Sequence, residues 1–342
     1  MNKYSDIRGM EWLHPSLASG EIVSIGVLVE DFLKPMSPEE VVAKRQQVNE
    51  MITSMTPQPD PKLLAKVDIA EYSAPGLKEE ASAPKVNLVA VSPKKRSSKK
   101  LPVLFSVHGG ALFFMKADQM VFQYISLALE LDCVIISPDY RCAPENQYPA
   151  AVNDVHAALL WVVDNAKMLG IDPSRIVAEG ASSGGHLAAA LTHRLKERGG
   201  PNLCAQVLEF PCLDDRMAVP SSNIFLENGW IPSMEQGMWR AWLGDKYVRA
   251  DTPPDAVPGH AKDFHGLPPA IIHSAENDHG RDDAISYASR LLQAGVYCDL
   301  HIWGGAYHAF NLAANDTELA RRCNDLLNMQ MKDALSGKLV RK

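Results

Sequence analysis

The sequence predicts a doubly wound α/β fold, in which helices cover both faces of a mostly parallel sheet. Three observations predict it: continuous apolar runs of strand length, helical runs with apolar residues three and four apart, and a regular alternation of the two after residue 107. The chain has 342 residues, of which 46% are hydrophobic, so it can bury a sizeable core. This length suits one large α/β domain or two medium ones.

The N-terminal part is predicted to be helical before the sheet begins. In residues 37–54, Ser37 suits the N-cap, Pro38 suits the first turn, and Glu39 complements the helix dipole. A proline-rich stretch at 57–61 then ends the helix.

Eight runs are predicted as strands. The first alternates polar and apolar residues, as an exposed edge strand does, whereas most of the later ones are continuously apolar, as in a parallel sheet covered on both faces. The helix predicted at 151–168 places Val152, Val155 and Leu159 on one side. The eight runs are 67–74, 86–92, 101–107, 133–140, 175–180, 205–211, 269–275 and 296–303.

One region interrupts the alternation. Residues 213–262 contain tryptophans, methionines and prolines without strand character. We expect this region to be an insertion that lies over the sheet.

Charge and cysteine usage limit the classes of partner. The net charge of −7 and a pI near 5.9 argue against a protein that binds nucleic acid. The one basic run, at 93–100, lies between two predicted strands and is interpreted as a solvated hairpin loop. No apolar stretch approaches the roughly 18 residues that span a bilayer, and the N-terminus lacks the apolar core of a signal peptide. The six cysteines form no paired framework, so we expect reduced thiols in a cytoplasmic protein without a membrane partner.

The stretch "GASSG" at 180–184 joins a predicted strand to a predicted helix. A nucleophile on such a sharp turn needs neighbours without side chains, and only Ser182 has glycines two residues before and after it. Ser183 would then contribute its backbone N–H. The alternative is a plain tight turn, and the strand–turn–helix context favours the nucleophile.

A serine nucleophile needs a histidine base and an acid that orients it. After the strand at 269–275 the chain offers Glu276, Asp278, Asp282 and Asp283, and the residue types alone do not choose among them.

His308 follows the last predicted strand, with glycines before it that allow its loop to bend toward Ser182. The competing histidines are assigned other places. We expect His273 and His301, within strands, to pack in the core, and His279 to lie on the surface.

The turn after the strand at 101–107 reads His108-Gly109-Gly110-Ala111. Glycines there allow the backbone to approach a substrate and to aim its N–H groups at an oxyanion. No metal-ligand motif and no nucleotide-binding glycine pattern occurs, so the sequence predicts no metal and no cofactor.

Taken together, five segments resemble the hormone-sensitive-lipase-like esterases of the α/β-hydrolase fold. The resemblance covers residues from about 67 to 325, and it implies an eight-stranded sheet and a helical cap. The segments, in chain order, are "HGGALFF", "PDYRCAPENQYPAAVNDVHAAL", "EGASSGGHLAAA", "AENDHGRDD" and "GGAYHAF".

The resemblance implies a role for each site residue. Ser182 would be the nucleophile, Asp278 the acid and His308 the base. The oxyanion hole would use Gly109, Gly110 and Ser183. It also implies cap segments at about 1–62 and 213–262, with the catalytic domain spanning 63–342. For the substrate pocket we single out His108, Ala111, Phe113, Phe114, Trp230 and Trp239.

The function implied is a serine carboxylesterase that hydrolyses short- to medium-chain esters of small molecules through an acyl-enzyme. An amidase, formamidase, carbamate or lactone hydrolase would use the same triad, and a non-catalytic receptor would keep only the pocket. The oligomeric state stays open, and a homodimer is compatible with the family.

The chain departs from the family pattern around the site. Tyr140, Arg141 and Glu145 match the family but are expected to fix loops. The departures are Ala111 for a third glycine, Ala181 and Ser183 around the nucleophile, His279 and Gly280 after the acid, and Ala309 after the base.

Overall fold

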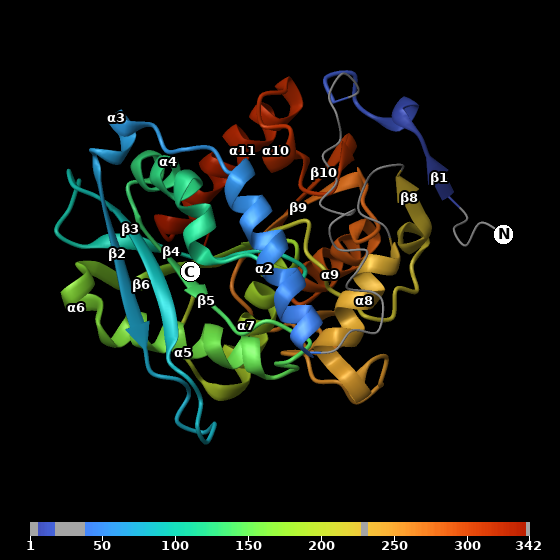
Figure 1. Cartoon of the computed structure of the whole chain (residues 1–342), viewed down its shortest axis with the longest axis horizontal. Coiled ribbons are helices and arrows are strands. Elements are labelled where there is room, and N and C mark those ends of the chain that lie inside the picture. The colour runs from blue at the N-terminus through green and yellow to red at the C-terminus, as the bar shows by residue number, and fades with distance from the viewer. Residues whose placement is uncertain (1–5, 18–37, 227–231, 340–342) are drawn as a thin grey trace.

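The computed structural model describes residues 6–17, 38–226 and 232–339 (Figure 1). At its centre is an eight-stranded sheet with the order β10-β9-β7-β6-β4-β5-β3-β2, and each of the eight predicted runs contributes one strand. Only β3 runs antiparallel to its neighbours, β2 and β5. The strands are β2 (Val67–Ala74), β3 (Val86–Pro93), β4 (Leu101–Val107), β5 (Val134–Asp139), β6 (Ile171–Ala181), β7 (Ala205–Glu209), β9 (Ala270–Asn277) and β10 (Cys298–Tyr307).

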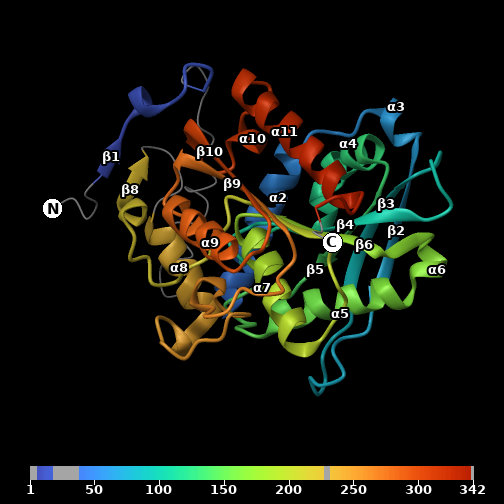
Figure 2. The same cartoon turned by 180° about the vertical axis from the view of Figure 1, so that it is seen from behind.

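Helices cover both faces of the sheet, as the continuous apolar strands predict (Figures 1 and 2). Alternate residues of β4 point to opposite faces of the sheet. Val103 and Phe105 pack in the hydrophobic cluster with α5, α7 and α9, whereas Leu104 packs in the cluster with α4 and α11. These helices are α4 (Val121–Leu131), α5 (Ala150–Asp164), α7 (Ser183–Arg198), α9 (Arg281–Gln293) and α11 (Glu318–Leu335).

The remaining helices are shorter or lie outside these layers. The helix predicted at 37–54 is α2 (Pro38–Met55), although Ser37 lies outside the described residues. The others are α3 (Pro61–Leu64), α6 (Ala166–Leu169), α8 (Pro232–Leu243) and α10 (Phe310–Ala313), with 3₁₀ turns at Met10–Trp12, Ala117–Met120, Pro220–Asn223, Gly244–Lys246 and Pro258–His260.

Two sequence-based expectations about local structure are wrong. The basic run is exposed, but it is no hairpin loop, because β3 pairs with β2 and β5 whereas β4 pairs with β5 and β6. The insertion at 213–262 does contain a strand, β8 (Ile224–Leu226), which pairs in parallel with β1 (Asp6–Arg8). Three-residue strands are too short to produce a recognisable alternation.

All six cysteines are free in the structure, and four of them are buried. Within residues 6–17, 38–226 and 232–339, no helix combines the length and the apolar content needed to cross a bilayer.

Candidate active site

The turn between β6 and α7 holds Ser182 in a backbone conformation that few residues adopt. Its φ of 57° and ψ of −123° lie outside the regions open to ordinary L-residues, and such strain is found chiefly at functional sites. The turn is fixed on both sides. The Ser182 N–H donates to the Glu209 carbonyl at 2.8 Å, and the Ser182 carbonyl accepts from the His186 N–H at 3.0 Å.

Gly180 and Gly184 are required because other backbone atoms approach them too closely for a side chain. A Cβ on Gly180 would lie 2.4 Å from the carbonyl carbon of Gly184, and one on Gly184 would lie 2.0 Å from the Val107 carbonyl oxygen. The sharp turn therefore needs the glycine spacing from which Ser182 was predicted as the nucleophile.

Three predicted residues from separate loops form one line of hydrogen bonds. His308 Nε2 lies 2.9 Å from Ser182 Oγ, and His308 Nδ1 lies 2.8 Å from Asp278 Oδ2. Asp278 follows the end of β9 and His308 follows the end of β10, so adjacent parallel strands deliver both side chains to the same edge of the sheet. The fold thus brings a hydroxyl, an imidazole and a carboxylate into contact, although Ser182 and His308 are 126 positions apart in the sequence.

Asp278 is held as a carboxylate. Its burial acts to raise the pKa, but the charge and hydrogen bond of His308 oppose this, as do His279 and the Gly280 N–H, and the pKa stays below its ordinary value. The Gly280 N–H donates to Asp278 Oδ1 at 3.0 Å. Among the four acids that the sequence left open, Asp278 is therefore the one that contacts His308 as an anion.

The loop after β4 places Gly109 and Gly110 beside this turn. A Cβ on Gly109 would lie 3.0 Å from the Ala181 carbonyl oxygen, and one on Gly110 would lie 2.2 Å from the Phe114 carbonyl oxygen. Gly110 also has a φ of +112°, which favours glycine. Ser183 joins the loop to the turn, because its Oγ accepts a hydrogen bond from the Leu112 N–H at 3.2 Å. The Gly109 backbone therefore lies beside the nucleophile turn, and Ser183 is bonded to the same loop.

Helix α2 holds the far end of this loop, a role that the sequence did not reveal. Asn49 accepts a hydrogen bond from the Met115 N–H at 2.8 Å, and Arg45 donates to the carbonyl oxygens of Phe113 and Ala143. These partners are separated by more than sixty positions, and no spacing rule connects them.

Tyr140 fixes the glycine loop after β4, as predicted. Its hydroxyl donates to the His108 carbonyl at 2.9 Å, and the two rings stack with their centroids 4.3 Å apart. His108 is buried, and burial lowers the pKa of its ring. The sequence predicts His108 in the substrate pocket, and in the structure its ring stacks on Tyr140.

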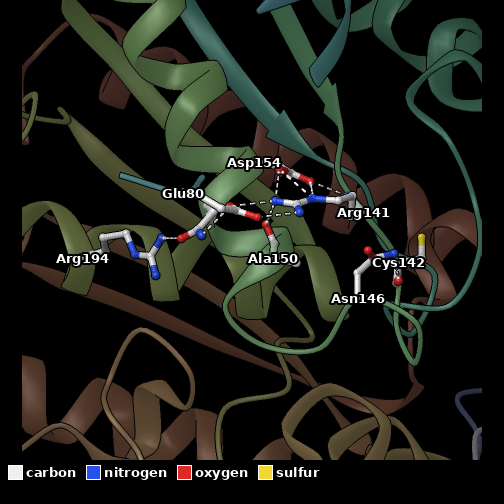
Figure 3. Close-up of polar contacts among 8 residues, drawn as sticks. Glu80, Arg141, Cys142, Asn146, Ala150, Asp154 and Arg194 are labelled. Atoms are coloured by element: carbon white, nitrogen blue, oxygen red, sulfur yellow. Dashed lines mark hydrogen bonds and ion pairs between the residues drawn. The ribbon is translucent and has the colours of Figure 1, made fainter. Parts of the chain in front are cut away.

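Arg141 joins the next segment to two acids (Figure 3). Its guanidinium lies 2.7 Å from Glu80 and 2.8 Å from Asp154, and these hydrogen bonds raise its pKa further. The Arg141 N–H also donates to Asp154 at 2.8 Å. The prediction that Tyr140 and Arg141 fix loops is confirmed.

Two buried glutamates lie beside the nucleophile turn. The backbone carbonyl of Glu209 accepts the hydrogen bond from the Ser182 N–H. Its side-chain carboxyl accepts a second hydrogen bond, at 2.9 Å, from Asn311, which lies three residues after His308 in the sequence. Burial raises the pKa of Glu209, and burial together with the neighbouring Glu209 raises the pKa of Glu179. Each carboxyl group is thus kept protonated to a higher pH than an exposed one.

The histidines outside the triad are placed as follows. His273 is fully buried, as predicted, but His301 is about a third exposed and pairs with Asp299. The prediction that His279 lies on the surface is wrong: its side chain is 3% exposed and contacts Glu235. A histidine beside a loop acid is expected at the surface only when no other element covers the loop, and here α8 covers it.

The predicted pocket residues within the described part of the chain can be placed individually. Phe113 and Phe114 are buried within the loop that follows Gly110, and Ala111 adopts a left-handed φ of 53°. Trp239 is buried edge-to-face against His186. Trp230 lies outside the described residues.

One cluster offers atoms of the kind that bind metals. Asp214, Asp215 and His260 bring three such atoms within 4.8 Å of one another. Arg216 already forms an ion pair with Asp214, and Asp215 faces His260 at 2.8 Å. Asp214 thus already has a cationic partner, and Asp215 and His260 contact each other.

Comparison with known proteins agrees with this fold. The family model Abhydrolase_3, which describes an α/β-hydrolase fold, matches residues 104–312. The carboxylesterase NlhH of Mycobacterium tuberculosis is 38% identical over 206 residues, covering 58% of this chain and 63% of NlhH. The match thus spans less than two thirds of that relative's own length.

Longer matches extend over most of the chain. The arylesterase of Saccharolobus solfataricus is 32% identical over 277 residues, covering 78% of this chain and 83% of that protein. The solved structure of a bacterial heroin esterase superposes with a TM-score of 0.83 at 32% identity, covering 95% of this chain and 99% of the other. The chain belongs to the α/β-hydrolase fold family, among the hormone-sensitive-lipase-like esterases.

Proposed function

We propose that this protein is a serine carboxylesterase that hydrolyses small carboxylic esters through an acyl-enzyme. The observation that carries the proposal is the line of two hydrogen bonds from Ser182 Oγ through His308 to Asp278, at 2.9 and 2.8 Å. Relatives named carboxylesterase and arylesterase support an ester as substrate.

Each group has one task in this reaction. Ser182 Oγ attacks the ester carbonyl carbon while His308 Nε2 takes the hydroxyl proton. Asp278 orients the imidazole and stabilises the imidazolium that forms. The His308 proton then passes to the leaving alcohol. Water attacks the acyl-enzyme by the reverse proton path, which releases the acid and restores Ser182.

The charge that develops on the carbonyl oxygen needs donors that are already in place. We assign this task to the N–H groups of Gly109, Gly110 and Ser183. Gly109 packs against the nucleophile turn, Gly110 packs against Phe114 of its own loop, and the Ser183 side chain is bonded to that loop. Such preorganised donors are worth roughly 100-fold to 1,000-fold in kcat each.

We further propose that residues 1–62 and 213–262 form a cap over the pocket. Within the described parts, α2 contacts the glycine loop and α8 contacts the loop of Asp278. A capped pocket suits short or medium acyl chains, with Ala111, Phe113, Phe114 and Trp239 near the acyl group.

The test is Ser182→Ala, measured with a series of aryl esters of increasing acyl length and with the matching anilides. We expect ester turnover to fall by about three orders of magnitude or more, with the circular dichroism spectrum unchanged. A fluorophosphonate probe should label the wild-type protein and leave the variant unlabelled. Near-normal turnover by the variant would overturn the assignment, and preference for the anilides would make the enzyme an amidase.

A further inference from the structure

The chain at the end of β7 contacts the loop of His308 through two neighbouring residues, Glu209 and Phe210. The centroid of the Phe210 ring lies 5.9 Å from that of the His308 ring and 5.9 Å, edge-on, from that of Phe310. The Glu209 carboxyl accepts a hydrogen bond from Asn311 Nδ2 at 2.9 Å. One strand end thus contacts both His308 and the short helix that follows it.

That helix, α10, depends on such contacts for its position. It has only four residues and begins at Phe310, and Ala309 separates it from His308 with a left-handed φ of 56°. A single helical turn is not stable on its own, so packing and side-chain hydrogen bonds must hold it. Phe310 and Asn311 are 0% and 1% exposed. A movement of α10 would therefore move the loop that carries His308.

The Asn311 amide is fixed from a second side by Asn324 of α11. Asn311 Nδ2 donates to Asn324 Oδ1 at 3.1 Å, and Asn324 Nδ2 donates to the Asn311 carbonyl at 3.2 Å. The amide nitrogen of Asn311 thus donates to two side chains, Asn324 and Glu209. This arrangement keeps the amide turned toward Glu209.

The same glutamate holds the nucleophile turn. Its backbone carbonyl accepts the Ser182 N–H at 2.8 Å. Glu209 is 7% exposed and is the last residue of β7, so the sheet sets its position. A chain of hydrogen bonds therefore runs from the Ser182 backbone through Glu209 to the helix after His308. It joins the two sides of the 2.9 Å contact between Ser182 Oγ and His308 Nε2 without using either side chain.

We propose that Glu209 and Asn311 are positioning residues, whose buried hydrogen bond fixes the loop of His308 at the distance from Ser182 that proton transfer requires. The proposal rests on the proposed function, because it takes Ser182 as the nucleophile and His308 as the base. Proton transfer needs a contact of hydrogen-bond length, and a displacement of about 1 Å can cost about 100-fold in rate. The pair supplies geometry rather than charge, since a neutral or an ionised carboxyl has an oxygen that accepts from Asn311.

The experiment measures kcat and KM for a soluble aryl ester at one neutral pH. Asn311→Leu keeps the side-chain size but removes the donor, and Glu209→Met removes the acceptor. Both should lower kcat about 10-fold to 100-fold and leave KM within about 2-fold, because the loop of the base shifts while the substrate pocket does not. Glu209→Gln keeps an oxygen that accepts from Asn311, so its kcat should stay within about 3-fold of the wild type.

The double variant with Asn311→Leu and Glu209→Met shows whether the two residues act through one contact. Its kcat should be about as low as that of either single variant, because the second change removes a bond that is already broken. The matched control is Asn328→Leu. Asn328 also donates to a glutamate at 2.9 Å, but it does so at the surface, to Glu130, and its loss should leave kcat unchanged.

Two results would overturn the proposal. One is a wild-type kcat in Asn311→Leu, and the other is an equal loss in Glu209→Gln and Glu209→Met, which would make the carboxyl charge or the packing the cause. A measurement on the wild type covers variants that fail to fold. The Asn311 side-chain amide should exchange its protons with water far more slowly than that of Asn328, and equal rates by NMR would refute the bond.

The outcome is separate from that of the proposed function. If a fluorophosphonate fails to label the wild type, the esterase itself is refuted. If the wild type is labelled and Asn311→Leu is labelled at the same rate, only the positioning role is refuted. With the role intact, labelling of Asn311→Leu should slow about as much as kcat falls, because the probe reacts with the same serine.

Discussion

Arg45 on α2 and Glu145 in the segment before α5 form a two-bonded ion pair, with both nitrogen–oxygen distances at 2.7 Å. The same guanidinium donates to the carbonyl oxygens of Ala143 and Phe113. One side chain of an N-terminal helix therefore joins two loops, one of which carries the glycines of the predicted oxyanion hole.

Arg45→Lys tests whether this junction supports the glycine loop. A lysine places one ammonium where the flat guanidinium makes four contacts, so the two loops should lose their common anchor. We expect kcat for ester hydrolysis to fall about 5-fold to 10-fold, and the free energy of unfolding to fall by about 1–2 kcal/mol in urea titrations.

The control for this change is Arg249→Lys. Arg249 pairs with Asp251 on the surface, where the same replacement should alter neither kcat nor stability measurably. Equal effects of both replacements would show that the loss at Arg45 is unrelated to the loop.

Gly110→Ala tests the geometry of the glycine loop itself. The added Cβ would lie 2.2 Å from the Phe114 carbonyl oxygen, at a φ of +112° that alanine avoids, so the loop must move. We expect kcat to fall about 100-fold or more while Ser182 stays in place. Gly295→Ala is the control, because Gly295 also has a positive φ, +74°, but an added Cβ there meets no atom within 4 Å, so kcat should stay unchanged. A Gly110→Ala enzyme of normal kcat would exclude this loop from the oxyanion hole.

Much of this architecture could be predicted from the sequence, because the signals were local. Apolar or alternating runs predict all eight strands of the central sheet, and the glycine spacing of 180–184 predicts Ser182 as the nucleophile. Strand order added the rest: the loops after β9 and β10 open at the same sheet edge as the nucleophile turn. Residue chemistry alone leaves Asp278 one of four acids; the family resemblance singles it out, and its contact with His308 agrees with that choice.

The side-chain contacts between α2 and the loops of the site could not be predicted from the sequence, because they join residues that are far apart in the chain. Arg45 and Asn49 contact residues more than sixty positions away, and their spacing follows no helical or strand period. The sequence predicts His279 at the surface because it neighbours the acid of the loop. Its burial depends on Glu235 of α8, which no pattern near His279 reveals.

The buried pair Glu179 and Glu209 should make stability depend on pH. Burial raises the pKa of both, so the folded state holds protons that the unfolded chain releases. Their contribution to stability is complete below the ordinary glutamate pKa and is lost as the pH rises through the raised values, at up to about 1.4 kcal/mol per pH unit for each proton.

Glu179→Gln removes one of these protons, so its urea stability should decline less steeply than that of the wild type between about pH 5 and about pH 9. Glu130→Gln is the matched control, because Glu130 forms an exposed ion pair with Lys332. The pH dependence of its urea stability should run parallel to that of the wild type. Parallel curves for Glu179→Gln as well would mean that the pair does not hold a proton.

Asp255→Ala should destabilise the fold strongly without acting on the chemistry. Asp255 lies 2.8 Å from Arg194, whose side chain is 1% exposed, and it also accepts a hydrogen bond from Tyr148 at 2.8 Å. Removing the carboxylate leaves a buried cation without its counter-ion, which costs about 3–5 kcal/mol in urea unfolding. The replacement Asp263→Ala, at an exposed pair with Lys196, should change the midpoint little. Because neither acid touches the triad, the folded fraction of both variants should keep wild-type kcat; a loss confined to kcat would contradict a purely structural role for Asp255.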